Sequence, residues 1–304
     1  MDKSKITKQN GNIAFEEEAH IYYDVTQPEQ KFISVTTLIH SFTQPFDKEF
    51  WSAYKALEKL LDKDSWAIEK KSLLSTKKFD KVLLEMHEIE ENDFNREQQA
   101  ILDAWDEENR KSCERGTRIH ADLENSFYKK GKDIDISKYQ IGGKFECRKD
   151  YNTLDLENGI YPEYLISRVS PDGKLRIAGQ IDLLVKKGNK FIIGDWKTNK
   201  KIETKSFYNK NTKSSVKMKF PLNNLDDVNY YHYALQLSTY AWMIQQLDPV
   251  YEIEDLVLVH FDHEDNMTVY HMPYLKDEVI KMLTFYKKES VLADSRRKRQ
   301  RIEY

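Results

Sequence analysis

The chain has 304 residues, of which 39% are hydrophobic and 33% charged, and its 48 basic and 51 acidic residues give a formal net charge of −3. The 18 Tyr and 14 Phe exclude a disordered composition, and the charge balance excludes a polycation, so any nucleic-acid affinity must come from local patches. Two cysteines are too few for a four-cysteine iron–sulfur cluster, and no apolar run approaches the ~20 residues that span a bilayer. Because residues 1–12 contain no apolar signal segment either, we expect a cytoplasmic protein with reduced thiols.

The start of the chain predicts a β-hairpin and a short helix. Residues 13–25 and 31–35 have the apolar and aromatic pattern of two strands, and the proline-containing segment 26–30 between them predicts a turn. Residues 36–42 predict a short capped helix, which is closed by the turn-forming residues that follow it.

A strongly charged segment comes next, and its pattern predicts helices. Between residues 45 and 112, Trp and Leu side chains recur near helical spacing, which predicts a helical subdomain or lid within a single domain that spans residues 1–304. The helical pattern continues over residues 95–128, and we expect a break near Gly116 because glycine weakens a helix.

The second half of the chain predicts a sheet. Three segments rich in Ile, Val and Tyr are bounded by turn signals and predict an antiparallel meander, namely residues 161–170, 174–187 and 189–197. The polar, lysine-rich residues 198–227 predict a long loop, and residues 230–247 predict a helix with an aromatic stripe.

The C-terminal part predicts two further strands, residues 255–262 and 267–272, and a closing helix over residues 275–294. The basic tail, residues 296–304, is expected to fray. Strands and helices in this order predict an α/β fold in which a mixed central sheet is flanked by helices.

Two aspartates and a lysine interrupt the apolar pattern of the meander. Strand alternation sends Asp195 and Lys197 to one face and Trp196 to the other, and the turn near residues 188–189 folds Asp182 back beside them. Burying such groups costs several kcal/mol per ion unless each has a partner, and a divalent ion is a natural partner for two carboxylates. A surface ion pair is the alternative interpretation, because so short a pattern often arises by chance.

Four motifs in this order resemble the PD-(D/E)XK nuclease superfamily, specifically its RecB-like exonuclease branch. They are "RGTRIHADLE" (115–124), "GQID" (179–182), "DWK" (195–197) and "QLSTY" (236–240). The segment "FISVTTLIHSF" near the start also resembles phage-encoded members, and the motif order is similar to that of the mitochondrial genome maintenance exonuclease. The resemblance implies a restriction-endonuclease-like core.

The resemblance also implies which residues act. Asp182 and Asp195 would bind the metal, with His120 and the backbone carbonyl of Trp196 as further ligands. Lys197 would position and activate the attacking water. The proline of the family motif is absent, and Ile181 stands in its place.

Four more residues are candidates for supporting roles. In the family an acidic residue at the position of Glu163 assists the metal, although here it could instead pair with a lysine across the sheet. Glu124 shares a helix face with the candidate histidine and either supports the site or is solvated. Gln236 and Tyr240 lie on one helix face and could bind DNA phosphates or brace the carboxylates, whereas the rest of their aromatic stripe is expected to be core.

The lysine-rich loop is a candidate DNA surface. Lys200 and Lys201 begin a run of lysines that could follow phosphates, and the interleaved Phe207, Tyr208 and Phe220 could stack on bases. A solvated loop is the alternative interpretation.

These features predict a Mg²⁺- or Mn²⁺-dependent deoxyribonuclease with no iron–sulfur cluster and no bound nucleotide, since no phosphate-binding glycine loop is present. The branch favours an exonuclease that acts on DNA ends or single strands, encoded by a phage and located in the host cytoplasm. Its partners in recombination or repair could be a recombinase, a helicase or a single-strand-binding protein. A structure-specific endonuclease and a non-catalytic nucleic-acid-binding protein are the alternatives.

Overall fold

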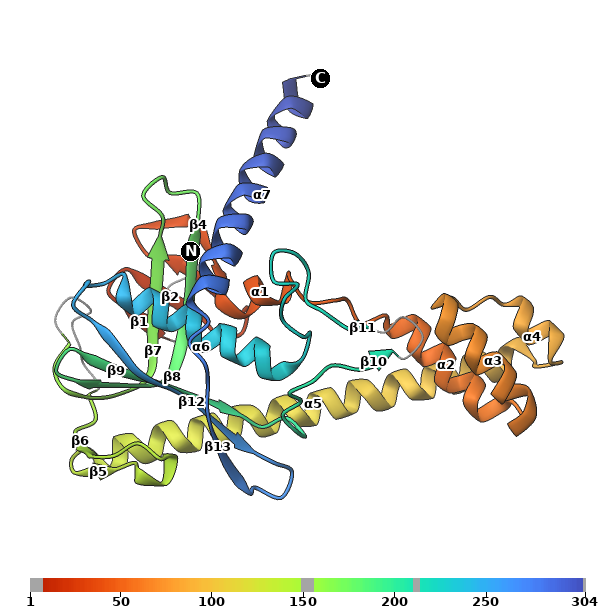
Figure 1. The fold of residues 1–304 in the computed structure, drawn as a ribbon, viewed down its shortest axis with the longest axis horizontal. Coiled ribbons are helices and arrows are strands. Elements are labelled where there is room, and N and C mark those ends of the chain that lie inside the picture. The colour runs from red at the N-terminus through yellow and green to blue at the C-terminus, as the bar shows by residue number, and fades with distance from the viewer. Residues whose placement is uncertain (1–7, 149–155, 210–213, 303–304) are drawn as a thin grey trace. The chain divides into compact units, whose positions relative to one another are not determined.

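The structure is a computed structural model that describes residues 8–148, 156–209 and 214–302. It divides into two compact units, one formed by Met1–Gln44 with Arg118–Tyr304 and the other by Pro45–Thr117. The first unit contains a nine-stranded mixed sheet, which is drawn in Figure 1. Its strands are β1 (Lys8–Asn10), β2 (Ile13–Glu16), β3 (Ile21–Asp24), β4 (Gln27–Ser34), β7 (Gly159–Val169), β8 (Arg176–Lys187), β9 (Lys190–Lys197), β12 (Glu252–Phe261) and β13 (Met267–His271).

The sheet is built around β8. The predicted antiparallel meander is confirmed, because β8 pairs with β7 on one edge and with β9 on the other. Two parallel pairings, β4 with β8 and β9 with β12, make the sheet mixed, as predicted. Along one edge of β8, β4 pairs at Ile177 and Ala178, and β9 pairs only from Leu183 onward. Residues 179–182 of β8 therefore lie at a gap between two neighbouring strands.

Helices cover one face of this sheet. The helices α1 (Val35–His40) and α6 (Asn229–Gln245) and the start of α7 (Lys276–Ile302) bury their apolar side chains against it. The helix α1 begins as its sequence predicts, because the Ser34 side chain accepts a hydrogen bond from the Thr37 backbone N–H.

The opposite face is covered by the end of α5 (Glu91–Lys130) and the segment that follows it. That segment contains β5 (Ile134–Asp135), β6 (Lys144–Phe145) and a single 3₁₀ turn (Ser137–Tyr139). Here Trp196 is 1% exposed and its ring packs against Tyr139 and Phe127. With helical segments on both faces, the predicted restriction-endonuclease-like core is confirmed.

Three local predictions are wrong. The predicted strand 13–25 is divided into β2 and β3 by a turn at residues 17–20, which ends in a left-handed His20, and the turn between β3 and β4 is confined to residues 25–26, so most of the expected turn over residues 26–30 is strand β4. The helix α5 continues through Gly116, because an interior glycine costs only about 1 kcal/mol and a helix of 40 residues absorbs it. The helix α7 includes residues 296–302 instead of fraying before them.

The lysine-rich loop is mostly irregular, as predicted, but its described residues include a small hairpin of β10 (Tyr208–Asn209) and β11 (Ser214–Ser215). Within the described parts of the chain, no helix combines the length and apolar character needed to cross a membrane.

The second unit, Pro45–Thr117, is helical. It contains α2 (Lys48–Leu60), α3 (Lys63–Thr76), α4 (Val82–Met86) and the part of α5 up to Thr117. Asp47 and Asp62 cap the first two of these helices by accepting backbone N–H bonds. Its small core is rich in aromatic side chains, with Phe50, Tyr54 and Phe94 among the buried residues. The sequence predicts a helical subdomain over residues 45–112, and its role as a lid stays a prediction.

Candidate metal centre

Asp182 and Asp195 face each other across β8 and β9. The register that pairs Leu183 with Gly194 places the two aspartates opposite each other, one position further along. There the ladder is continued by a side chain, since the backbone N–H of Trp196 donates to Asp182 Oδ2 at 2.8 Å. Asp182 is 8% exposed and Asp195 1%, so both carboxylates are largely withdrawn from water.

Asp195 is held by a lysine and a glutamine. Lys197 Nζ lies 2.5 Å from Asp195 Oδ2, on the same face of β9 as alternation predicts. On the other side, Gln236 Nε2 of α6 donates to Asp195 Oδ1 at 3.0 Å. The ammonium also lies 5.0 Å from the centre of the Tyr233 ring, a cation–π contact that the sequence did not predict.

His120 of α5 approaches the other aspartate. Its Nδ1 lies 3.6 Å from Asp182 Oδ2 and 3.7 Å from Glu163 Oε1. Its Nε2 lies 3.1 Å from the carbonyl oxygen of Trp196, so the ring donates a hydrogen bond there. This contact orients the ring so that Nδ1 faces the two carboxylates, as is common for histidines that bind metals. The predicted ligand carbonyl of Trp196 thus has a partner in His120.

Glu163 occupies an irregular position in β7. Its φ is +53°, in the left-handed region, and the ladder pairs its neighbours, Pro162 with Leu183 and Tyr164 with Ile181. Because of this irregularity, residues 161 and 164 both face the core that α1, α6 and α7 cover, although strict alternation would put them on opposite faces of the sheet. Glu163 is 9% exposed, and its Oε1 is buried without a hydrogen-bond partner.

Two residues that the sequence did not single out hold the other oxygen of Glu163. Gln180 donates a hydrogen bond to Oε2, and Lys8 Nζ of β1 lies 3.4 Å from the same atom. Lys8 also pairs with Glu124, at 3.3 Å. The lysine therefore links Glu124 to Glu163, and we refer to these residues with His120, Asp182, Asp195 and Lys197 as the acidic cluster. Sequence could not have signalled Lys8, because the pattern around it is polar and its partners are far along the chain.

The ligand atoms of three of these residues converge. One atom each from His120, Glu163 and Asp182 lie within 4.8 Å of one another, a group that could hold a metal ion. Asp195, a predicted ligand, is outside this group: its Oδ1 accepts from Gln236, and its Oδ2 pairs with the Lys197 ammonium but is otherwise buried without a hydrogen-bond partner.

The site shifts the pKa values of its members. Burial raises the pKa of Asp182, and it raises that of Asp195 to about 6 although Lys197 opposes the shift. Burial lowers the pKa of His120, but the carboxylates of Asp182 and Glu163 outweigh it and raise the value to about 9. The ring is therefore protonated at neutral pH without a metal, and metal binding would displace that proton.

We expect the metal-free protein to be less stable at pH 9 than at pH 6.5. An unfolded histidine titrates near pH 6.5, so the contribution of His120 is full below about that pH and is lost as the pH rises through about 9. Asp195 acts in the same direction between about pH 4 and pH 6. Thermal unfolding in EDTA at both pH values measures the difference, which His120→Asn should reduce. An equal decrease in that variant would contradict this assignment.

Tyr240 packs against the backbone of β8 instead of facing solvent. It is 3% exposed, and a Cβ added to Gly179 would lie 2.6 Å from its ring and 2.8 Å from its hydroxyl. Gly179→Ala should therefore destabilise the protein by about 1–3 kcal/mol, because the buried ring has to move. Gly142→Ala is the matched control, since nothing lies within 4 Å of its Cβ position. Equal urea midpoints for the two variants would contradict this packing.

Lys200 and Lys201 lie outside the cluster. Both are exposed in the turn after β9, where Lys201 pairs with Glu203. Phe207, Tyr208 and Phe220 are exposed at 76%, 54% and 65%, and the Phe220 ring also packs against Phe285.

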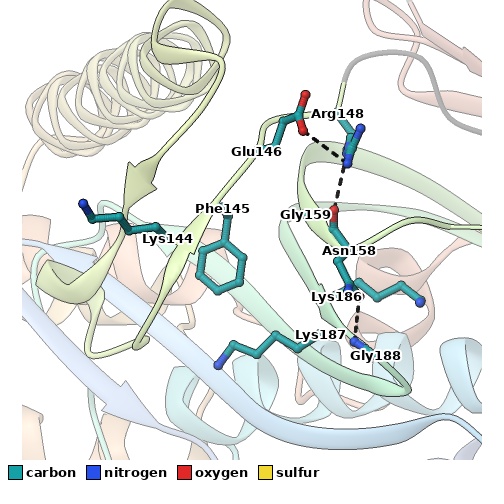
Figure 2. A pocket seen from close by; sticks show the side chains of 9 residues that line it. All are labelled: Lys144, Phe145, Glu146, Arg148, Asn158, Gly159, Lys186, Lys187 and Gly188. Atoms are coloured by element: carbon teal, nitrogen blue, oxygen red, sulfur yellow. Dashed lines mark hydrogen bonds and ion pairs between the residues drawn. The ribbon is translucent and has the colours of Figure 1, made fainter.

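A pocket of about 370 Å³ lies at the C-terminal end of β8 and is shown in Figure 2. Lys186 and Lys187 line it, several residues along the strand from Asp182. Its charges are largely paired, with Arg148 against Glu146 and Glu157 at 3.3 and 2.8 Å. Its lining contains no histidine and no pair of carboxylates, so the cluster around Asp182 is the better candidate for chemistry.

Comparison with known proteins gives one broad match. Residues 37–302 match the model of the PD-(D/E)XK nuclease superfamily. Among solved structures, SSO0001 is 18% identical with a TM-score of 0.26, over 44% of this chain and 50% of that one. A candidate exonuclease from Eubacterium rectale is 16% identical with a TM-score of 0.29, over 43% of each chain.

The chain therefore spans half or less of each of these two structures. Both TM-scores are below 0.5, so the assignment rests on the family match alone. No curated protein matches significantly.

Proposed function

The chain belongs to the PD-(D/E)XK nuclease superfamily, and from that premise we propose that it is a divalent-metal-dependent deoxyribonuclease that degrades DNA from ends or as single strands. The observation that carries the proposal is the convergence of His120, Glu163 and Asp182, whose ligand atoms lie within 4.8 Å of one another. These three side chains lie near Lys197, which is the lysine of the motif that gives the superfamily its name.

The residues fit a hard divalent ion. Glu163 Oε1 is buried without a hydrogen-bond partner, a state that costs free energy unless a cation occupies the space in front of it. Two carboxylates and an imidazole suit Mg²⁺ or Mn²⁺, which prefer oxygen ligands. We propose that His120, Glu163 and Asp182 hold the ion and that Asp195 remains a further candidate. When bound, such an ion would polarise the scissile phosphate and stabilise the departing oxygen.

The chain's own residues supply positioning and charge. The Lys197 ammonium, fixed by Asp195 at 2.5 Å, would orient the attacking water and stabilise negative charge that develops on the phosphate. Gln236 supports this arrangement by binding the second oxygen of Asp195. His120 in turn donates to the carbonyl of Trp196, which keeps its Nδ1 directed at the carboxylates.

The lysine-rich loop supports a single-stranded substrate. Phe207 and Tyr208 expose their rings at the start of the small hairpin and could stack on bases, whereas Lys205 and Lys219 are exposed and could contact phosphates. Phosphate contacts carry no sequence information, so we propose low sequence specificity. The preference for ends comes from the resemblance of the motifs to the RecB-like branch.

The test uses end-labelled linear oligonucleotides, single- and double-stranded, together with circular single-stranded DNA. Degradation of the linear substrates in Mg²⁺, none in EDTA, and resistance of the circle would support an exonuclease. Cutting of the circle would replace it with the endonuclease alternative. Binding without cleavage under every metal condition would favour the non-catalytic alternative.

The cellular setting is a further part of the proposal. We propose a phage-encoded enzyme in the host cytoplasm that acts in recombination or repair. The sequence has no phosphate-binding glycine loop, so strand separation would be supplied by a helicase, and a recombinase or single-strand-binding protein would receive the product.

A further inference from the structure

Lys8 places a fixed positive charge inside the acidic cluster. Its Nζ lies 3.3 Å from Glu124 Oε1 and 3.4 Å from Glu163 Oε2, and its side chain is 30% exposed. The short strand β1 is anchored two residues later, where the Asn10 side chain donates to the carbonyl of Leu165 at 2.8 Å in a buried contact. The ammonium is therefore held by both backbone pairing and ion pairing.

The charges in the cluster favour a single divalent ion. Four carboxylates, those of Glu124, Glu163, Asp182 and Asp195, face two ammonium groups, those of Lys8 and Lys197. With His120 neutral as a ligand, the sum is four negative and two positive charges, or −2, which one divalent ion neutralises. A second divalent ion would leave an excess of +2 in a largely buried site, which is unfavourable.

We propose that Lys8 is a positioning residue whose ammonium takes the place of a second cation between Glu124 and Glu163, so that the site binds one divalent ion. This inference rests on the proposed metal-dependent function. Lys8 holds Glu163 Oε2, which leaves Oε1 directed at His120 as the metal-facing oxygen. Without the ammonium, Glu124 and Glu163 could share a second ion.

The experiment counts Mn²⁺ ions bound to the full-length protein, by electron paramagnetic resonance and calorimetry without DNA. We expect one ion for the wild type, two for Lys8→Met and one for Lys8→Arg, which keeps the charge. The first ion should bind Lys8→Met about tenfold more tightly, because a nearby positive charge is gone. Lys31→Met, an exposed lysine of β4, is the matched control and should bind one ion as the wild type does.

A double variant makes the test specific. Lys8→Met with Glu124→Gln should bind one ion again, because Glu124 is the proposed ligand of the second. Two ions on the wild type, or a single ion on Lys8→Met with unchanged affinity, would overturn the role of Lys8 and leave the nuclease proposal standing. A wild type that binds no Mn²⁺ would overturn both. Circular dichroism and the folding of Lys8→Arg separate these outcomes from misfolding.

Discussion

Asp182→Asn is expected to lower the rate of DNA cleavage by about 10³-fold and to leave the protein folded. The substitution removes a charged ligand from the proposed metal group, and such a group supplies several kcal/mol of transition-state stabilisation. Asparagine retains an oxygen that can accept the backbone N–H of Trp196, which now donates to Asp182 at 2.8 Å. Stability should be unchanged or slightly higher, because a buried charge is removed.

Asp182→Ala separates the two roles of this side chain. It should be equally inactive but also less stable by about 1–3 kcal/mol, because the buried N–H of Trp196 loses its acceptor. Initial rates with Mg²⁺, together with urea unfolding of both variants, measure these effects. Substantial activity in Asp182→Asn would remove the basis of the proposed metal group, and equal stability of the two variants would contradict the structural role.

Lys197→Met is expected to abolish cleavage and to destabilise the protein in a pH-dependent way. The methionine keeps the length of the side chain, but it leaves the carboxylate of Asp195, which is 1% exposed, without its cation. Breaking a buried pair in this way costs about 3–5 kcal/mol at pH 8. At pH 5 the cost should be smaller, because the pKa of Asp195 is already about 6 and loss of the lysine raises it further.

The double variant Lys197→Met with Asp195→Asn tests this explanation. Removing both charges should restore most of the stability but none of the activity, since the ammonium is needed for chemistry and the pair is not needed for folding. Urea unfolding at pH 5 and pH 8 and a cleavage assay give the two measurements. Full activity in Lys197→Met, or a stability loss independent of pH, would contradict the role given to Lys197.

Much of the fold could be predicted because its signals are local. The three strands of the meander, the helix with the aromatic stripe and the strands after it follow periodicity and turn residues, and the structure confirms them. The errors arose where a single residue, a glycine or a proline, was taken to end an element that its neighbours continue. Gly116 lies within a long helix whose many other residues outweigh one glycine. At the N-terminus, the turn expected over residues 26–30 is confined to residues 25–26, and the additional turn at residues 17–20 was not predicted.

The site was predictable only in part. Alternation and one tight turn were sufficient to bring Asp182, Asp195 and Lys197 together, because these residues belong to one hairpin. The contact of His120 with the carbonyl of Trp196 and the position of Lys8 depend on the packing of distant segments, which periodicity does not encode. The left-handed backbone of Glu163 had no sequence signal at all, since glycine is the residue usually expected there.

The left-handed backbone of Glu163 indicates a compromise between the stability of the fold and the chemistry of the proposed site. A non-glycine residue in the left-handed region costs about 1–2 kcal/mol, and β7 carries this penalty at the one place where its side chain meets the proposed metal. A search for thermostable variants would favour glycine at this position and would remove the carboxylate with it. The glutamate at residue 163 therefore serves the proposed metal site at a cost in stability.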